Sequence, residues 1–185
     1  MALFSYFHKG ELPLHSLNFG TIILVPKSKK LNKYNNIDLS VCSMLFFWLN
    51  RLSTRALLKR KNMYLEDYNC VFCNLDHEED LFHLFFHCPF AVSYWYSLNV
   101  LVPNSLDLEF LLQSFKSQLR VPFFVEVIVT MCWSIWSMRN DAIFNNLAPS
   151  LQRCKMVFRK EFALVILRGK AKFHPLVDQW LEVFV

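Results

Sequence analysis

Glycine is scarce in this sequence, with three in 185 residues. Three glycines cannot build a glycine-rich phosphate-binding loop, which needs several of them for backbone amides to approach a phosphate. Glycine also supplies the turns of many-stranded β folds, so its scarcity favours helices. The Gly-x-Ser-x-Gly turn of serine hydrolases and the His-Glu-x-x-His motif of zinc peptidases are absent as well. The sequence therefore indicates no enzyme of these classes.

A secretory signal is not evident either, because the first residues, MALFSYFHKGELPLHSL, hold no basic start followed by an apolar core. We therefore expect a reducing compartment inside the cell, nuclear or cytoplasmic. In such a compartment, closely spaced cysteines are expected to bind metal or to be redox-active before they form a structural disulfide.

One stretch comes near to a membrane span without reaching it. Residues 121–138 are eighteen residues with Glu126 as their single charge, whereas a spanning helix needs roughly 20 apolar residues. We expect this stretch to be a buried helix, and we expect no membrane partner.

Apolar residues are abundant, since 54% of the sequence is hydrophobic and nineteen residues are Phe. Such a chain is not disordered, because it carries a large apolar surface that folding can bury. After residue 42 the apolar residues recur at helical spacing, and Ser53 or Thr54 is placed to cap a second, shorter helix over 55–61. We expect helices over six ranges: 43–62, 80–88, 89–98, 106–118, 122–146 and 150–168.

The formal net charge of +5 is compatible with a nucleic-acid partner but does not require one. Arg51, Arg55 and Lys59 recur every four residues, which would form a basic stripe along one side of a helix. A stripe of this kind can bind the phosphates of a nucleic acid. The alternative is that it forms the solvated side of an amphipathic helix.

Residues 70–88, CVFCNLDHEEDLFHLFFHC, hold three of the six cysteines and three of the six histidines. Cys70 and Cys73 have the Cys-x-x-Cys spacing of one half of a tetrahedral zinc site. A redox-active pair and inert buried thiols are the alternatives. The second half of a zinc site would come from four candidates: His77, His83, His87 and Cys88. The other cysteines lie in apolar settings and are expected in the core: Cys42, Cys132 and Cys154.

His83 and Cys88 are five residues apart, which is roughly 140° in projection on an ideal helix. They can share a metal only if the helix does not stay regular, and Pro89 disfavours a helical conformation for the residue before it. A thiolate is also a softer ligand for zinc than the His87 imidazole. We therefore favour a closed, structural Zn²⁺ site, with His77 exposed in a loop and four ligands: Cys70, Cys73, His83 and Cys88.

Residues 70–95, CVFCNLDHEEDLFHLFFHCPFAVSYW, closely resemble the zinc-binding domain that follows the reverse transcriptase in plant LINE-type (non-LTR) retroelements. Residues 46–63 are similar to the helices before that domain, and 133–146, with Trp-x-x-Trp-x-x-Arg-Asn, to the helix after it. The family pattern is Cys-x-x-Cys, an acidic stretch, His-Leu-Phe-x-x-Cys-Pro-x-Ala and a Trp. It is matched by Cys70, Cys73, Glu79, His83, Leu84, Phe85, Cys88, Pro89, Ala91 and Trp95.

Residues 7–41 resemble the opening fingers segment of the same reverse transcriptases, although Asn35 and Asn36 stand where that family has Arg and Pro. The polymerase palm holds two metal ions on paired carboxylates, and this sequence contains no Asp-Asp pair. The resemblance therefore implies a protein without polymerase activity.

The resemblance also implies partners. They are RNA or DNA, or a reverse transcriptase domain in a parent polyprotein. The residues expected to face phosphate are Arg51, Arg55, Lys59, Arg60 and Lys61. The alternative is a protein-interaction scaffold, or a non-functional retroelement remnant, that does not bind nucleic acid.

Together these observations predict a mainly α protein. A helical domain organised around a zinc knuckle would cover 43–168. A short extended arm would cover 1–42. Within it, the pattern of residues 20–30 predicts a short strand that ends at Pro26 and a lysine run. An apolar tail over 169–185 is expected to dock on the rest of the chain.

Overall fold

The computed structural model describes residues 51–167 and 174–183. The extended arm and the fingers resemblance predicted within 1–42, the start of the helix predicted from residue 43, and Cys42 lie outside these residues. The end of the helix predicted at Gly169 also lies outside them.

Helices form most of this part of the chain, which contains no strand, only an isolated antiparallel bridge between Asn69 and Glu78. The predicted mainly α class is confirmed. In chain order the helices are α3 (Arg55–Arg60), the π-helix η2 (His83–His87), α4 (Pro89–Tyr96), α5 (Leu108–Leu119), α6 (Phe124–Phe144), α7 (Leu151–Leu167) and α8 (His174–Val183).

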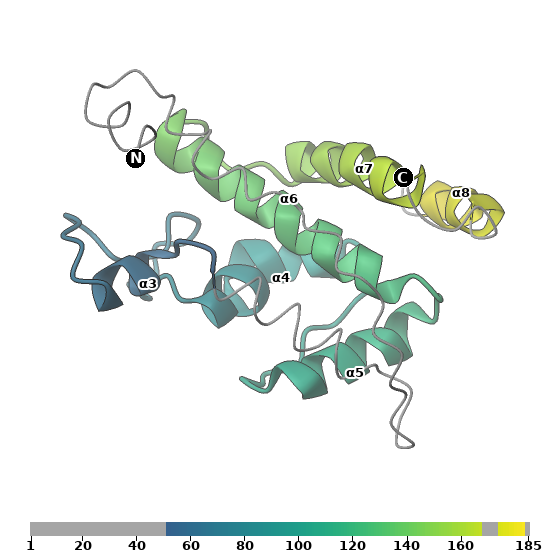
Figure 1. Cartoon of the computed structure of the whole chain (residues 1–185), viewed down its shortest axis with the longest axis horizontal. Helices are drawn as coiled ribbons and strands as arrows, with labels where there is room; N and C mark the ends of the chain where they lie inside the picture. The colour runs from purple at the N-terminus through teal and green to yellow at the C-terminus, as the bar shows by residue number, and fades with distance from the viewer. Residues whose placement is uncertain (1–50, 168–173, 184–185) are drawn as a thin grey trace, which may run out of the picture.

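The long helix α6 is the centre of the fold. Figure 1 shows it running diagonally, with α7 beside it and α5 below its start, and α4 contacts α7. Its buried residues include Ile128, Met131 and Ile135. The stretch 121–138 therefore contains the start of a core helix, as expected. Among the described helices, no single one is both long and apolar enough to cross a membrane. Helices α5 and α6 reach that length and apolar composition only when they are counted together, and the angle between them is 112°.

An aromatic stack joins α4 and α5 to the cysteine segment. The Trp95 ring lies 4.6 Å from Phe115 and 6.1 Å from Phe86, measured between ring centroids. Its indole N–H donates to the carbonyl oxygen of Phe85 at 2.7 Å, so the one polar atom of this buried side chain is satisfied. These contacts fix the direction in which α4 leaves η2.

A second aromatic group holds α8 against α7. Trp180 lies with its ring centroid 5.6 Å from Phe162, 6.2 Å from Phe158 and 5.9 Å from Phe123, at the start of α6. The prediction that the apolar tail docks on the rest of the chain is confirmed for its described residues, which form a helix.

Helix starts follow the expected capping chemistry. The Thr54 side chain accepts a hydrogen bond from the Leu57 amide at the start of α3, and Asp107 accepts one from the Glu109 amide at the start of α5. Pro89 occupies the first turn of α4. Because α3 begins at its own cap, Arg51 precedes the helix, and the basic stripe predicted through this residue is not continuous.

Candidate metal centre

Four side chains converge at one point. The ligand atoms of Cys70, Cys73, His83 and Cys88 all lie within 4.8 Å of one another. The sulfurs of Cys70 and Cys88 are 3.8 Å apart, and the Cys73 sulfur lies 3.3 Å from the Nε2 atom of His83. In a tetrahedral site with Zn–S bonds of about 2.3 Å, two sulfurs stand about 3.8 Å apart. The donor types and the separation of the Cys70 and Cys88 sulfurs therefore fit zinc.

The Cys-x-x-Cys half of the site lies in a loop closed by backbone hydrogen bonds. The amide of Cys70 donates to the carbonyl of His77 at 2.8 Å, and the amide of Glu79 donates to the carbonyl of Tyr68 at 2.9 Å. These two bonds fold residues 70–77 back on themselves. Both cysteines of this half therefore face the helix that supplies the other two donors.

The other half of the site depends on the π-helix η2. The Cys88 amide donates to the His83 carbonyl at 2.6 Å, a bond that spans five residues. Such a turn brings residues five apart nearly above one another, whereas a regular α-helix would separate them. Cys88 itself has an extended backbone (φ −61°, ψ 134°), so the expected departure from the helix before Pro89 is confirmed. The sequence did not predict the π-turn.

Backbone amides favour thiolates at this site. Each of the three cysteine sulfurs faces an amide from a residue just after it in the chain, and these contacts favour the thiolate. At Cys70 the contact with Cys88 and burial outweigh the amide, and at Cys73 burial outweighs it, so the pKa of both thiols is raised. The amides belong to Phe72 beside Cys70, to Leu75 beside Cys73, and to Phe90 and Ala91 beside Cys88. They would offset part of the charge of about −1 that one Zn²⁺ and three thiolates carry.

The four donors differ in their protonation. The Cys70 thiol donates to the Cys88 sulfur, and this contact lowers the pKa of Cys88 while it raises that of Cys70, which burial raises further. Burial also raises the pKa of Cys73. Burial lowers the pKa of His83, so its ring is neutral near pH 7 and offers a lone pair to a metal.

The other two histidines of the segment are placed differently. His87 stacks on Phe82, with ring centroids 6.4 Å apart, and its Nε2 atom is buried without a partner in the described part of the chain. It does not belong to the converging group. His77 is exposed in the loop, as expected, and its ring lies 5.1 Å from that of His83.

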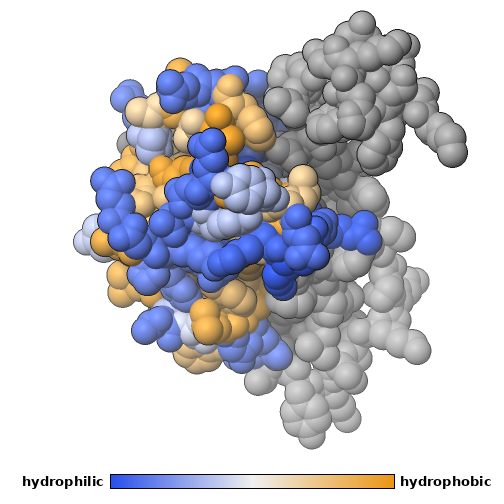
Figure 2. Space-filling model, turned by 90° about the vertical axis from the view of Figure 1, so that its left-hand side faces the viewer, coloured by the Kyte–Doolittle hydropathy of each residue, from blue (hydrophilic) through white to orange (hydrophobic). Residues whose placement is uncertain are grey.

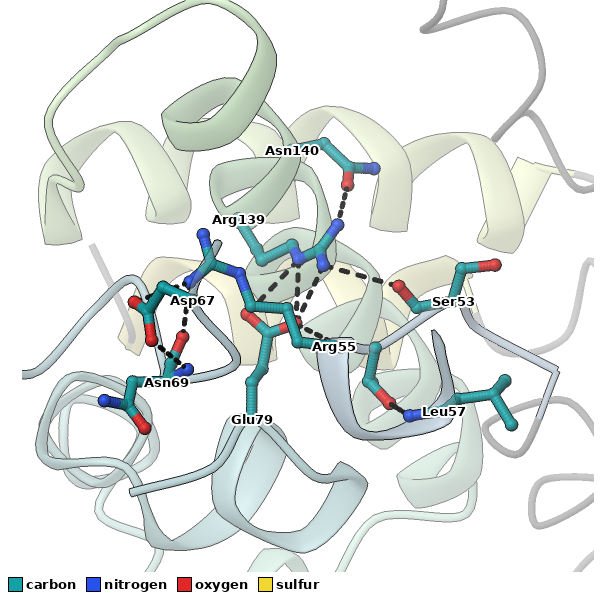
Figure 3. A network of polar contacts seen from close by, with 9 residues as sticks. Ser53, Arg55, Leu57, Asp67, Asn69, Glu79, Arg139 and Asn140 are labelled. Atoms are coloured by element: carbon teal, nitrogen blue, oxygen red, sulfur yellow. Dashed lines mark hydrogen bonds and ion pairs between the residues drawn. The ribbon is translucent and has the colours of Figure 1, made fainter. Parts of the chain in front are cut away.

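A buried ion pair connects the metal segment to α6 (Figure 3). Nη2 of Arg139 donates to Oε1 of Glu79 at 2.8 Å, and the two side chains are 4% and 0% exposed. The same guanidinium donates to the carbonyl of Ser53 at 3.3 Å and to the side chain of Asn140 at 3.1 Å, and it lies 4.7 Å from the centre of the Trp136 ring. The Arg139 guanidinium is therefore held by hydrogen bonds, by the Glu79 carboxylate and by the Trp136 ring.

Glu79 is also connected to α3. Its Oε1 atom accepts from the Arg55 amide at 3.1 Å, and its carbonyl accepts from the Ala56 amide at 3.1 Å. One carboxylate thus joins the first turn of α3, the metal segment and α6. Sequence reasoning matched Glu79 and Arg139 to the family pattern but did not predict that they pair. An arginine that follows a long apolar stretch of the helix was the available signal, because such a charge needs a partner when it is buried.

The residues expected to face phosphate are partly engaged by acids. Arg55 donates to Asp67 at 3.1 Å and to the Asn69 carbonyl at 2.7 Å, and Lys59 pairs with Glu78 at 2.8 Å. Arg60 and Lys61 are exposed at the end of α3, and Arg51 is exposed before its cap. Figure 2, which looks at this end of the molecule, shows a band of hydrophilic residues across its centre.

Comparison with known proteins agrees with the geometry. Residues 26–95 match the family model described as zinc-binding in reverse transcriptase, a range that contains all four converging residues. Searches of curated proteins and of solved structures gave no match. The family match and the group of three cysteines and one histidine together support a reverse-transcriptase-associated zinc-binding domain in this chain.

Proposed function

We propose that this protein is a structural zinc module of a reverse transcriptase-like protein from a plant LINE-type (non-LTR) retroelement. In this proposal it associates with RNA or DNA and has no polymerase activity. The observation that carries the proposal is the convergence of Cys70, Cys73, His83 and Cys88 at separations that fit one tetrahedral ion.

A structural role follows from the number of protein donors. A catalytic zinc keeps one position for water or substrate, whereas three sulfurs and one imidazole fill all four positions. When bound, the ion would supply cross-linking between the loop 70–77 and η2. Two connections would then fix the neighbouring helices relative to the metal site. The chain continues directly from η2 into α4, and Glu79 pairs with Arg139 of α6.

The proposed absence of polymerase activity rests on the missing Asp-Asp pair, because phosphoryl transfer by a palm domain needs paired carboxylates for its metal ions. We expect the purified chain to extend no primer on an RNA or DNA template in the presence of Mg²⁺. Extension above that of a blank preparation would contradict this part of the proposal.

The proposed nucleic-acid association has a specific rival. The pairing of Arg55 with Asp67 and of Lys59 with Glu78 uses two of the five expected phosphate contacts. This observation favours the alternative, a protein-interaction scaffold that does not bind nucleic acid. Binding of the full chain to a labelled single-stranded RNA and to a DNA duplex, measured over a series of salt concentrations, separates the two. Affinity that falls steeply as salt rises supports the proposal, and no binding at low salt supports the scaffold.

A further inference from the structure

A second basic stretch lies towards the end of the chain, far from the basic residues 51–61. Residues 153–172 hold seven of the twenty Lys and Arg but only one of the fifteen Asp and Glu. Their formal charge of +6 therefore exceeds the +5 of the whole chain, and the remaining residues are slightly acidic together. The stretch lies outside 26–95, so the charge is not a feature of the matched zinc domain.

Most of this stretch is the helix α7, whose apolar side is buried. Cys154, Phe158 and Phe162 are at most 4% exposed, and the hydroxyl of Tyr94 on α4 donates to the Cys154 carbonyl at 3.2 Å. Figure 1 shows α7 lying along α6, well away from α3. The packing holds α7 in one orientation, so the side chains on its other side are presented by a rigid element.

The exposed side of α7 carries three cations without acidic partners. Arg159 and Lys160 are exposed, Lys155 is half-buried, and no carboxylate in residues 51–167 or 174–183 lies within ion-pair distance of any of them. Two of the three cations of α3 differ, since Arg55 and Lys59 are paired with acids. The α7 cations are therefore available to an outside anion, as are the exposed Arg60 and Lys61 at the end of α3.

The spacing of these cations suits a repeating anion. Lys155 and Arg159 are one turn apart, about 6 Å along the helix axis. Both line a small hollow whose other walls are apolar, formed by Tyr94, Leu98, Phe158 and Leu181. Two cations beside a small apolar surface match a sugar–phosphate backbone, in which charged phosphates alternate with less polar sugars.

We propose that the basic face of α7, formed by Lys155, Arg159 and Lys160, is the surface on which this protein binds the phosphate backbone of RNA or DNA. The inference rests on the proposed nucleic-acid association and places the contact on α7 instead of α3. An anionic membrane is the less suitable partner, because an interfacial helix needs its apolar side for the lipid and α7 buries that side in the core.

The test compares two variants of the full chain that lose the same charge. One is Lys155→Gln, Arg159→Gln, Lys160→Gln. The matched control, Arg60→Gln, Lys61→Gln, Arg120→Gln, neutralises three exposed cations on other elements. Binding to a single-stranded RNA and a DNA duplex is measured over a salt series, with far-UV circular dichroism and zinc content as checks on folding.

We expect the α7 variant to bind about tenfold or more weakly at about 0.1 M salt. The slope of log affinity against log salt should become shallower by about 2 for single strands, since each lost phosphate contact removes about 0.7. The control variant should change the affinity and the salt slope much less. Glu161→Gln, which removes the one acid of the stretch, should tighten binding and serves as a second variant that keeps every cation.

Several outcomes would overturn the inference. If the parent chain binds and both triple variants lose affinity equally, binding follows overall charge and not this face. If the α7 variant binds as the parent does, the inference fails while the proposed association stands. If the parent chain binds no nucleic acid but binds phosphatidylserine vesicles or an acidic polypeptide, the inference and the proposed association both fail.

Discussion

The four candidate ligands are individual residues whose protonation and placement are set by their immediate neighbours. Three of them are cysteines that face backbone amides, and the fourth is an imidazole kept neutral by burial. The amide of His83 donates to the Asp80 carboxylate at 2.8 Å, which anchors the start of the turn that carries it. Removing any one donor would leave an open or three-coordinate ion, and the affinity would fall sharply.

Cys73→Ser and His83→Ala should each reduce bound zinc from one ion per chain to well below one. Both substitutions remove a donor, and the far-UV circular dichroism should also weaken because the bound metal contributes to folding. Elemental analysis of the purified variants measures the zinc.

The matched control for these variants is Cys132→Ser, because Cys132 is fully buried in α6 and does not belong to the converging group. It should retain one zinc per chain. Unchanged zinc in both ligand variants would refute the ligand set.

Zinc affinity should increase with pH between about pH 7 and about pH 8. The contact with Cys88 and burial raise the pKa of Cys70, and burial raises that of Cys73, so both thiols hold protons in the metal-free protein and release them to zinc. Burial lowers the pKa of His83 from its ordinary value of 6.5, so the ring is already neutral in this range and releases none. Each thiol that releases a proton on zinc binding gives about a tenfold gain in affinity per pH unit.

Competition with a chromophoric chelator at the two ends of this pH range checks the sign and the size of the effect. An affinity that does not change would mean that the thiols are already ionised before zinc binds. That result would contradict the protonation described for Cys70 and Cys73.

Among the elements, the contact between the metal segment and α6 rests on the pair of Glu79 and Arg139. Breaking a buried pair by removing one partner leaves a charge without compensation, which costs about 3–5 kcal/mol. Exposed pairs contribute far less, because water screens them and the side chains lose freedom to form them. The chain offers both kinds, since the pair of Lys59 and Glu78 lies at the surface.

Arg139→Met should therefore lower the free energy of unfolding by about 3–5 kcal/mol, measured by urea denaturation of the zinc-loaded chain. Lys59→Met, the control, should change it little. In the double variant Glu79→Gln, Arg139→Met, the total loss should be smaller than the sum of the single losses, because no buried charge remains. Additive losses would mean that the two side chains do not act as a pair.

Sequence patterns predicted most helices but not the turn that forms the metal site. The cap at Thr54 was one of two predicted from the sequence because capping is a local property, and α5, α6 and α7 begin within two residues of the predicted positions. A π-turn has no comparable signature. The spacing of His83 and Cys88 showed only that a regular α-helix could not bring both side chains to one metal ion. The backbone conformation that replaces the regular helix depends on the packing of Phe85 and Phe86 in the core.

Across the whole molecule, the fold has a part that depends on the metal and a part that does not. The loop 70–77, η2 and the start of α4 surround the four donors. By contrast, α6, α7 and α8 pack through large apolar side chains far along the chain from them, such as Phe162 and Trp180. The Glu79–Arg139 pair and the acids facing α3 also join residues distant in sequence, which explains why the sequence could indicate that Arg139 needs a partner but could not identify that partner or the acids facing α3.

Removal of zinc by a chelator should loosen the first part more than the second. Amide hydrogen exchange of residues 70–96 should accelerate strongly, whereas α6 and α7 should keep most of their protection, because burial of their apolar residues does not involve the ion. Mass spectrometry of peptides from the chelated and zinc-loaded chains measures both regions. Equal acceleration throughout would show that the whole molecule unfolds with loss of the metal.

X-ray absorption at the zinc edge of the purified full chain identifies the atoms that surround the ion. The geometry predicts one zinc per chain with three sulfurs at about 2.3 Å and one nitrogen at about 2.0–2.1 Å. A chain that carries no stoichiometric zinc, or a zinc surrounded by oxygen and nitrogen with fewer than three sulfurs, would contradict the account.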